Sequence, residues 1–144
     1  MKKFRGCYGI ILFPFLIVGL SGCATTAADA LKANESQVQL RSIQTRVFDT
    51  TDKKKMLQTV ISTMQDLDFV IDKADFTLGS VTGSKFLEQT VITMSVTVRP
   101  RGEKQLLVRA NAQYGVSSVE DPGTYQDFFT ALEKSIFLTA QQVD

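Results

Sequence analysis

Apolar residues are distributed in two different ways along the chain. Residues 8–20 (YGIILFPFLIVGL) form one unbroken apolar run without a charge, whereas beyond residue 40 apolar and polar residues alternate with the periods of strands and helices. Between these parts, residues 24–40 are rich in Ala, Thr, Ser and Gln and contain no aromatic residue. The pattern divides the chain into an apolar leader, a flexible tether and one folded domain over residues 41–144.

The clearest alternation lies in residues 91–98 and 106–114, where every second side chain is apolar. The polar segment 100–104 (PRGEK) separates the two, so the pattern predicts an antiparallel hairpin. Its polar face carries Thr93, Ser95, Thr97, Arg99, Arg109, Asn111 and Gln113.

Two segments have helical periodicity. Apolar residues recur from Met56 to Leu67 at the spacing of one helix face, and Asp49, Thr50 and Thr51 are candidate N-caps. A second helix is expected after Asp121 as N-cap and Pro122 at the first helical position, a position that suits the fixed proline dihedral. Its apolar stripe comprises Tyr125, Phe128, Phe129, Leu132, Ile136 and Ala140.

Three further strands are expected at residues 42–48, 69–72 and 78–85, the last weakened by Gly79 and Gly83 and interpreted as a flexible edge strand. The order is β-α-β-β-β-β-α. Each strand offers one apolar side and each helix one apolar stripe. We therefore predict an α+β fold, an antiparallel sheet of four to five strands with two helices packed on one face.

This order, with the phrases MQDLDFVIDKAD and LGSVTGSK, resembles the helix-grip module found in a lipoprotein component of the bacterial β-barrel assembly machinery. It also looks like a family of small bacterial envelope lipoproteins. The resemblance covers about residues 43–140 and implies the fold and an envelope location, but no functional residue.

The leader has the plan of a secretory signal, because basic Lys2, Lys3 and Arg5 precede the apolar run. The run is shorter than the roughly 20 apolar residues of a membrane span, and Pro14 interrupts it. The following Leu20-Ser21-Gly22-Cys23 resembles the lipobox of bacterial lipoproteins. In that family the cysteine thiol receives a diacylglycerol, the chain is cut before the cysteine, and the new amino group is acylated.

The resemblance implies a signal peptide over residues 1–22, lipidation of Cys23 and a tether over residues 23–40. Loss of Lys2, Lys3 and Arg5 from the 16 basic residues leaves 13 against 15 acidic ones, a mature net charge of about −2. Ala24, rather than aspartate, follows the cysteine, which favours the outer over the inner membrane. We expect the domain to face the periplasm.

The amino-acid composition excludes several kinds of catalytic and binding site. The 144 residues include no histidine, so Ser-His and Cys-His dyads and histidine-ligated metals are excluded. The charge balance gives no reason to expect nucleic acid as a partner. We predict no enzyme activity, no cofactor and no metal. Asp66, Asp68, Asp72 and Asp75 lack EF-hand spacing and are interpreted as carboxylates flanking a strand, and segment 79–85 (GSVTGSK) departs from the Walker pattern.

Two features remain as possible contacts with a partner or with lipid. Lys53, Lys54 and Lys55 form the only basic run of the expected mature chain, and they either contact anionic groups or form a solvated face. Phe86 and Leu87 either anchor another chain or cap the core. The function expected is an accessory or binding subunit of an envelope assembly for β-barrel assembly, efflux or secretion. The alternative is a periplasmic carrier of a small ligand or lipid in a cavity beneath the last helix.

Overall fold

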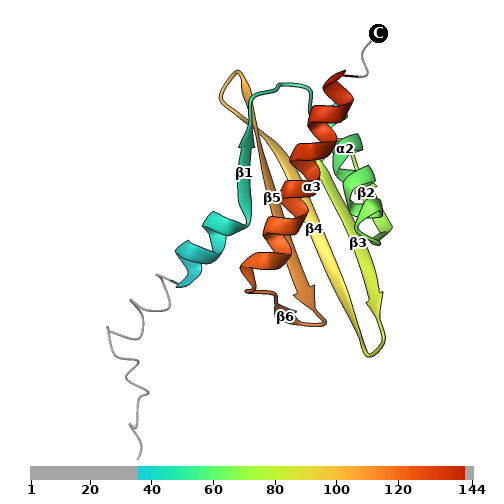
Figure 1. Cartoon of the computed structure of the whole chain (residues 1–144). Helices are drawn as coiled ribbons and strands as arrows, with labels where there is room; N and C mark the ends of the chain where they lie inside the picture. The colour runs from blue at the N-terminus through green and yellow to red at the C-terminus, as the bar shows by residue number, and fades with distance from the viewer. Residues whose placement is uncertain (1–35, 142–144) are drawn as a thin grey trace, which may run out of the picture.

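One antiparallel sheet forms the centre of the domain (Figure 1). The computed structural model describes residues 36–141. The strand order is β1-β5-β4-β3-β2, and the short β6 pairs with β5 next to β1. The strands are β1 (Thr45–Phe48), β2 (Val70–Asp75), β3 (Ser80–Leu87), β4 (Thr90–Arg101), β5 (Gln105–Tyr114) and β6 (Ser117–Ser118).

Two helices, α2 (Lys53–Asp66) and α3 (Pro122–Gln141), pack against the sheet, and a third helix over residues 36–43 precedes β1. The fold class predicted from the sequence is therefore confirmed as α+β. The core lies between the sheet and the helices α2 and α3, and its largest fully buried side chains are Tyr125, Phe128, Phe129, Leu57, Met64, Met94, Leu106 and Leu132. None of the helices in the described part of the chain is both long and apolar enough to span a bilayer.

The hairpin of β4 and β5 has the predicted alternation. Met94 pairs with Ala112 and Val96 with Ala110, and all four side chains are buried beneath the helices. The intervening pairs, such as Ser95 with Asn111, point to the opposite side of the sheet. No helix or loop of the described residues packs on that side, which we call the open face (Figure 1).

The helix caps agree with the sequence at one helix and differ at the other. Asp121 caps α3 as predicted, because its Oδ2 accepts a hydrogen bond from the Thr124 amide at 3.1 Å. The N-cap of α2 is Asp52, whose Oδ1 accepts from the Lys55 amide at 2.9 Å, so the prediction of Asp49, Thr50 or Thr51 is wrong. Each capping carboxylate satisfies an amide that has no partner within its own helix.

The segment interpreted as a flexible edge strand is an interior strand. β3 pairs with β2 on one side and with β4 on the other, so the edge-strand interpretation is wrong. A Cβ at Gly83 would lie 2.8 Å from the carbonyl oxygen of Val70 and 3.0 Å from the Met64 side chain. Glycine is therefore needed there for the close approach of α2 and β2, and its presence does not indicate a weak strand.

The start of the domain also differs from expectation. Residues 36–43 are helical, although the sequence predicted tether up to residue 40 and strand from residue 42. Leu40 and Ile43 explain the difference, because both pack against the core from this helix. Tertiary packing stabilises a helix that is too short to be stable alone in water.

Thr63 on α2 offers a test of the packing. It is fully buried, and its hydroxyl has no hydrogen-bond partner. We expect Thr63→Val to raise the free energy of unfolding by about 1 kcal/mol, because valine keeps the shape and removes an unsatisfied polar group. Urea denaturation of the chain beginning at residue 24 measures the change.

The matched control is Thr59→Val on the same helix face. Thr59 is 6% exposed, and its hydroxyl donates to the Lys55 carbonyl at 2.9 Å, so no gain in stability is expected there. Equal effects of the two substitutions would show that the missing hydrogen bond of the Thr63 hydroxyl does not lower the free energy of unfolding.

Candidate functional site

A gap in strand pairing lies along the outer edge of β5. On this edge, β1 pairs with residues 106–109 of β5 and β6 pairs with residues 113–114. Residues 110–112 therefore have a strand partner only on the other side, in β4. Part of the gap is closed by the chain before β1, because the Ala110 amide donates to the Gln44 carbonyl at 2.9 Å. The Ala112 amide, further along, needs another acceptor.

The Tyr125 hydroxyl on α3 provides that acceptor. It accepts from the Ala112 amide at 3.3 Å and from Gln44 Nε2 at 3.1 Å, and it donates to the Val119 carbonyl at 2.6 Å. The side chains of Tyr125 and Gln44 are 0% and 4% exposed. One buried hydroxyl thus joins α3, the edge of β5, the chain before β1 and the chain after β6. We call these contacts the Tyr125 node.

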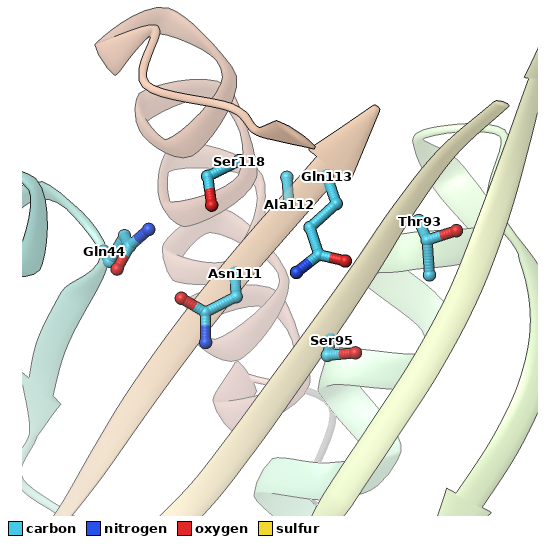
Figure 2. A pocket seen from close by; sticks show the side chains of 7 residues that line it. All are labelled: Gln44, Thr93, Ser95, Asn111, Ala112, Gln113 and Ser118. Carbon is cyan, nitrogen blue, oxygen red and sulfur yellow. The ribbon is translucent and has the colours of Figure 1, made fainter. Parts of the chain in front are cut away.

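A hollow opens on the sheet beside the Tyr125 node (Figure 2). Its volume is about 330 Å³. Figure 2 shows side chains from neighbouring strands β4 and β5 around it, with Gln44 and Ser118 on the two sides of the gap. The lining residues are Gln44, Thr93, Ser95, Asn111, Ala112, Gln113 and Ser118.

The hollow is rich in polar groups available for binding. Within the described residues, the side chains of Thr93, Asn111, Gln113 and Ser118 have no hydrogen-bond partner, whereas Ser95 Oγ lies 3.2 Å from Thr82 Oγ1. Four hydroxyl and carboxamide groups therefore face one hollow with their donors and acceptors free for a ligand.

Arg109 adds a cation to the rim of this region. Its Nη2 donates weakly to Gln44 Oε1 at 3.4 Å, while its buried Nε has no partner in the described structure. A guanidinium holds several fixed donors, and some of these stay available to a partner. The arrangement suits binding through hydrogen bonds, and it contains no pairing of a nucleophile with a base.

A second hollow of about 690 Å³ lies at the turn between β4 and β5 and is open to solvent. Its lining residues are Asp49, Arg101, Glu103, Lys104 and Gln105. Gln105 Nε2 donates to Asp49 Oδ1 at 2.6 Å across it. Its mixed charges and exposed turn are typical of a solvated surface, so we prefer the hollow beside the Tyr125 node.

The two contact features predicted from the sequence lie at opposite ends of the sheet. Lys53 Nζ donates to the Thr77 carbonyl at 2.9 Å, next to the start of β3, whereas Phe86 and Leu87 end that strand. The strand length separates them by about 23 Å. Lys53 thus has a structural partner, while Lys54 is exposed and Lys55 is half-buried.

Phe86 and Leu87 do not cap the core. They are 69% and 43% exposed. Of the two interpretations given for them, packing into the core is therefore wrong, and a contact beyond the domain remains a prediction.

Of the four aspartates near β2, three have separate local contacts, and Asp66 is exposed at the end of α2. Asp68 lies 3.4 Å from Lys85 Nζ, Asp72 accepts from Ser84 Oγ at 2.7 Å, and Asp75 accepts from the Leu78 amide at 2.8 Å. Within residues 36–141 we find no group of three or more acidic or cysteine side chains placed to hold a metal ion. The carboxylates serve turns and strand pairing.

The sequence placed the open face correctly but did not reveal the hollow. Thr93, Asn111 and Gln113 were expected on one polar face, and the structure puts them there. Gln44 and Ser118 were missed, because only the gap between β1 and β6 brings them beside β5. The Tyr125 hydroxyl was missed because helical periodicity reports the buried ring and not the polar atom at its end.

Comparison with known proteins adds no assignment. The chain matches no model of a protein family, and it matches none of the curated proteins.

The Tyr125 node yields a stability prediction. We expect Tyr125→Phe to lower the free energy of unfolding by about 1–3 kcal/mol, because it leaves buried polar groups at Gln44, Ala112 and Val119 without their partner. Chemical denaturation of the chain from residue 24 measures the loss, and hydrogen exchange should show faster exchange at the Ala112 amide.

Tyr114→Phe is the matched control for this substitution. Tyr114 is 42% exposed, and its hydroxyl has no hydrogen bond within the described structure, so its removal should change stability little. The node would lose its assigned role if Tyr125→Phe proved as mild as Tyr114→Phe.

Proposed function

We propose that the protein is a lipid-anchored envelope lipoprotein, held at the outer membrane and facing the periplasm, that acts by binding as an accessory subunit of an envelope assembly. β-barrel assembly, efflux and secretion complexes each suit such a subunit. No catalytic step, cofactor or nucleic acid enters the proposal.

The anchor rests on the N-terminal sequence. Leu20-Ser21-Gly22-Cys23 follows a basic start and an uncharged apolar run, which is the order of a lipoprotein signal. These residues lie outside the described part of the structure. Several acyl chains on one protein give lasting attachment, whereas a single chain gives only reversible binding.

The observation that carries the binding role is the open face of the sheet. Both core helices cover the other face, and the open face presents the polar hollow beside the Tyr125 node with unsatisfied hydroxyl and carboxamide groups. Arg99 is exposed and Arg109 is half-buried on the same face. This chemistry favours a partner that offers backbone or side-chain carbonyls to the hollow and a carboxylate to the arginines.

The alternative function, a carrier, would need an apolar cavity between the sheet and α3. In that space Tyr125, Phe128 and Phe129 are at most 2% exposed, and the two phenyl rings meet edge to face with centroids 5.2 Å apart. Both hollows described above lie elsewhere and have polar or charged linings. The packing therefore favours binding at the surface over carriage inside the domain.

Substitution of Cys23 tests the anchor. Cys23→Ala should abolish lipid attachment, since the thiol is the attachment atom, and should leave residues 1–22 on the chain, since the cut in the lipobox family is made before an acylated cysteine. Mass spectrometry of the N-terminal peptide measures both effects. Cys7→Ala is the matched control and should leave both unchanged, because Cys7 lies within the expected signal peptide. Acyl groups that remain on the N-terminal peptide of Cys23→Ala would contradict the anchor.

Photo-crosslinking in the native envelope tests the binding face. A crosslinking residue placed at Thr93 or Asn111 on the open face should give a discrete protein adduct. The same residue at Gln58 on α2 or Gln126 on α3, both exposed on the helical side, should not. Adducts of equal yield from both sides, or no adduct from the open face, would contradict a binding role for this face.

A further inference from the structure

Five exposed apolar or aromatic side chains gather at one end of the sheet. They belong to the β3–β4 turn and to the turn between β5 and β6. Their exposed fractions are 69% for Phe86, 43% for Leu87, 37% for Val91, 42% for Tyr114 and 99% for Val116. We call this group the apolar tip.

Strand register brings the two turns together. Phe86 pairs with Val91 across β3 and β4, and the next residue of β4, Ile92, pairs with Tyr114 at the end of β5. The turn that holds Val116 therefore lies level with the start of β4, on the neighbouring strand. Figure 1 shows both turns at the same end of the sheet.

Val116 has no role inside the domain. It occupies a two-residue turn beside Gly115, whose φ is 57°. Such turns favour glycine, asparagine and aspartate, which adopt the required backbone and are well solvated. A valine there buries almost none of its surface, so its apolar side chain points to a contact beyond the folded domain.

The path of the chain indicates what that contact is. β1 runs antiparallel to β5 from Thr45, opposite Arg109, to Phe48, opposite Leu106. Its N-terminal end therefore lies toward Tyr114, and the chain enters the sheet from the end that carries the apolar tip. Residues 24–35 connect Cys23 to the helix over residues 36–43, and a segment of that length reaches about 40 Å at most.

We propose that the apolar tip inserts into the interfacial layer of the same phospholipid membrane that holds the acylated Cys23. This inference rests on the proposed lipid anchor. Phe86, Leu87, Val91 and Val116 contribute apolar surface, and Tyr114 places a ring with a polar end at the level of the headgroups. The open face and its hollow then stand roughly upright on the membrane, accessible to a partner from the side.

The charged side chains near the apolar tip indicate which kind of lipid it contacts. Glu88 lies in the β3–β4 turn, and Glu120 and Asp121 lie just before α3, while Lys85 sits beside Asp68. This end carries no excess of positive charge, so contact with zwitterionic lipid depends on apolar burial and changes little with salt. The lysines at residues 53–55 lie at the opposite end, and contact there would require anionic lipid and would weaken with salt.

Fluorescent labels at single introduced cysteines test the orientation. Lipidated full-length protein, whose mature form has no other free thiol, is labelled at Phe86→Cys or Val116→Cys and reconstituted into phosphatidylcholine vesicles that carry a quencher on the acyl chains. Quenching at these two sites should be several times greater than at the control Leu78→Cys, and it should be unchanged between low and high salt. Leu78 matches Phe86 in exposure, at 69%, but lies next to the opposite end of β3.

The outcomes separate this inference from the anchor. Protein without acyl groups on Cys23 would defeat the proposed anchor itself. Acylated, vesicle-bound protein with equal quenching at residues 86, 116 and 78, or with none, would overturn insertion of the tip and leave the anchor intact. Discrete protein crosslinks from residue 86 in native envelopes, without quenching in vesicles, would also overturn it and assign the apolar tip to a protein partner.

Discussion

The hydrogen bonds of the Tyr125 hydroxyl hold together the part of the fold on which the candidate site depends. That one atom satisfies the Ala112 amide at the gap in the edge of β5, orients the buried Gln44 side chain and binds the Val119 carbonyl. Because the aromatic ring is also fully buried among the core side chains, α3 cannot shift without breaking polar contacts at the sheet edge. Core packing and the shape of the hollow are therefore coupled through a single residue.

The domain is asymmetric in two directions, and each asymmetry has a physical consequence. Across the sheet, the apolar face is covered by α2 and α3, whereas polar strand residues such as Ser95 and Asn111 lie on the open face. Along the strands, one end carries the apolar tip, and the other carries the exposed Phe76 and Leu78 together with Lys53, which is fixed to the Thr77 carbonyl. With the domain held at the end that carries the apolar tip, as proposed, the open face would point in a defined direction. The proposed binding of a partner beside a membrane requires such an orientation.

Much of the fold was predictable because its signals are local. The alternation of β4 and β5, the periodicity of α2 and the Asp121-Pro122 start of α3 each depend on neighbours in the sequence. The predictions that proved wrong concern residues whose structure depends on contacts with distant parts of the chain. Gly83 suggested a weak edge strand, but it is glycine because Met64 and the Val70 carbonyl approach it closely. The helix over residues 36–43 was expected as tether up to residue 40 and as strand from residue 42, because its stability comes from packing of Leu40 and Ile43 and not from its own sequence.

The sequence by itself determined the α+β class, the polar character of the open face and the absence of histidine, because composition and periodicity report which side chains share a face. It also supplied the lipobox resemblance at Cys23, which lies outside the described structure. Only the tertiary structure decided that Gln44 and Ser118 meet at one hollow and that Phe86 and Val116 share one end. It also decided that the lysines of residues 53–55 lie at the other end of the sheet, away from the apolar tip. These placements depend on strand order and register, which join residues that are distant in the chain and leave no periodic mark in it.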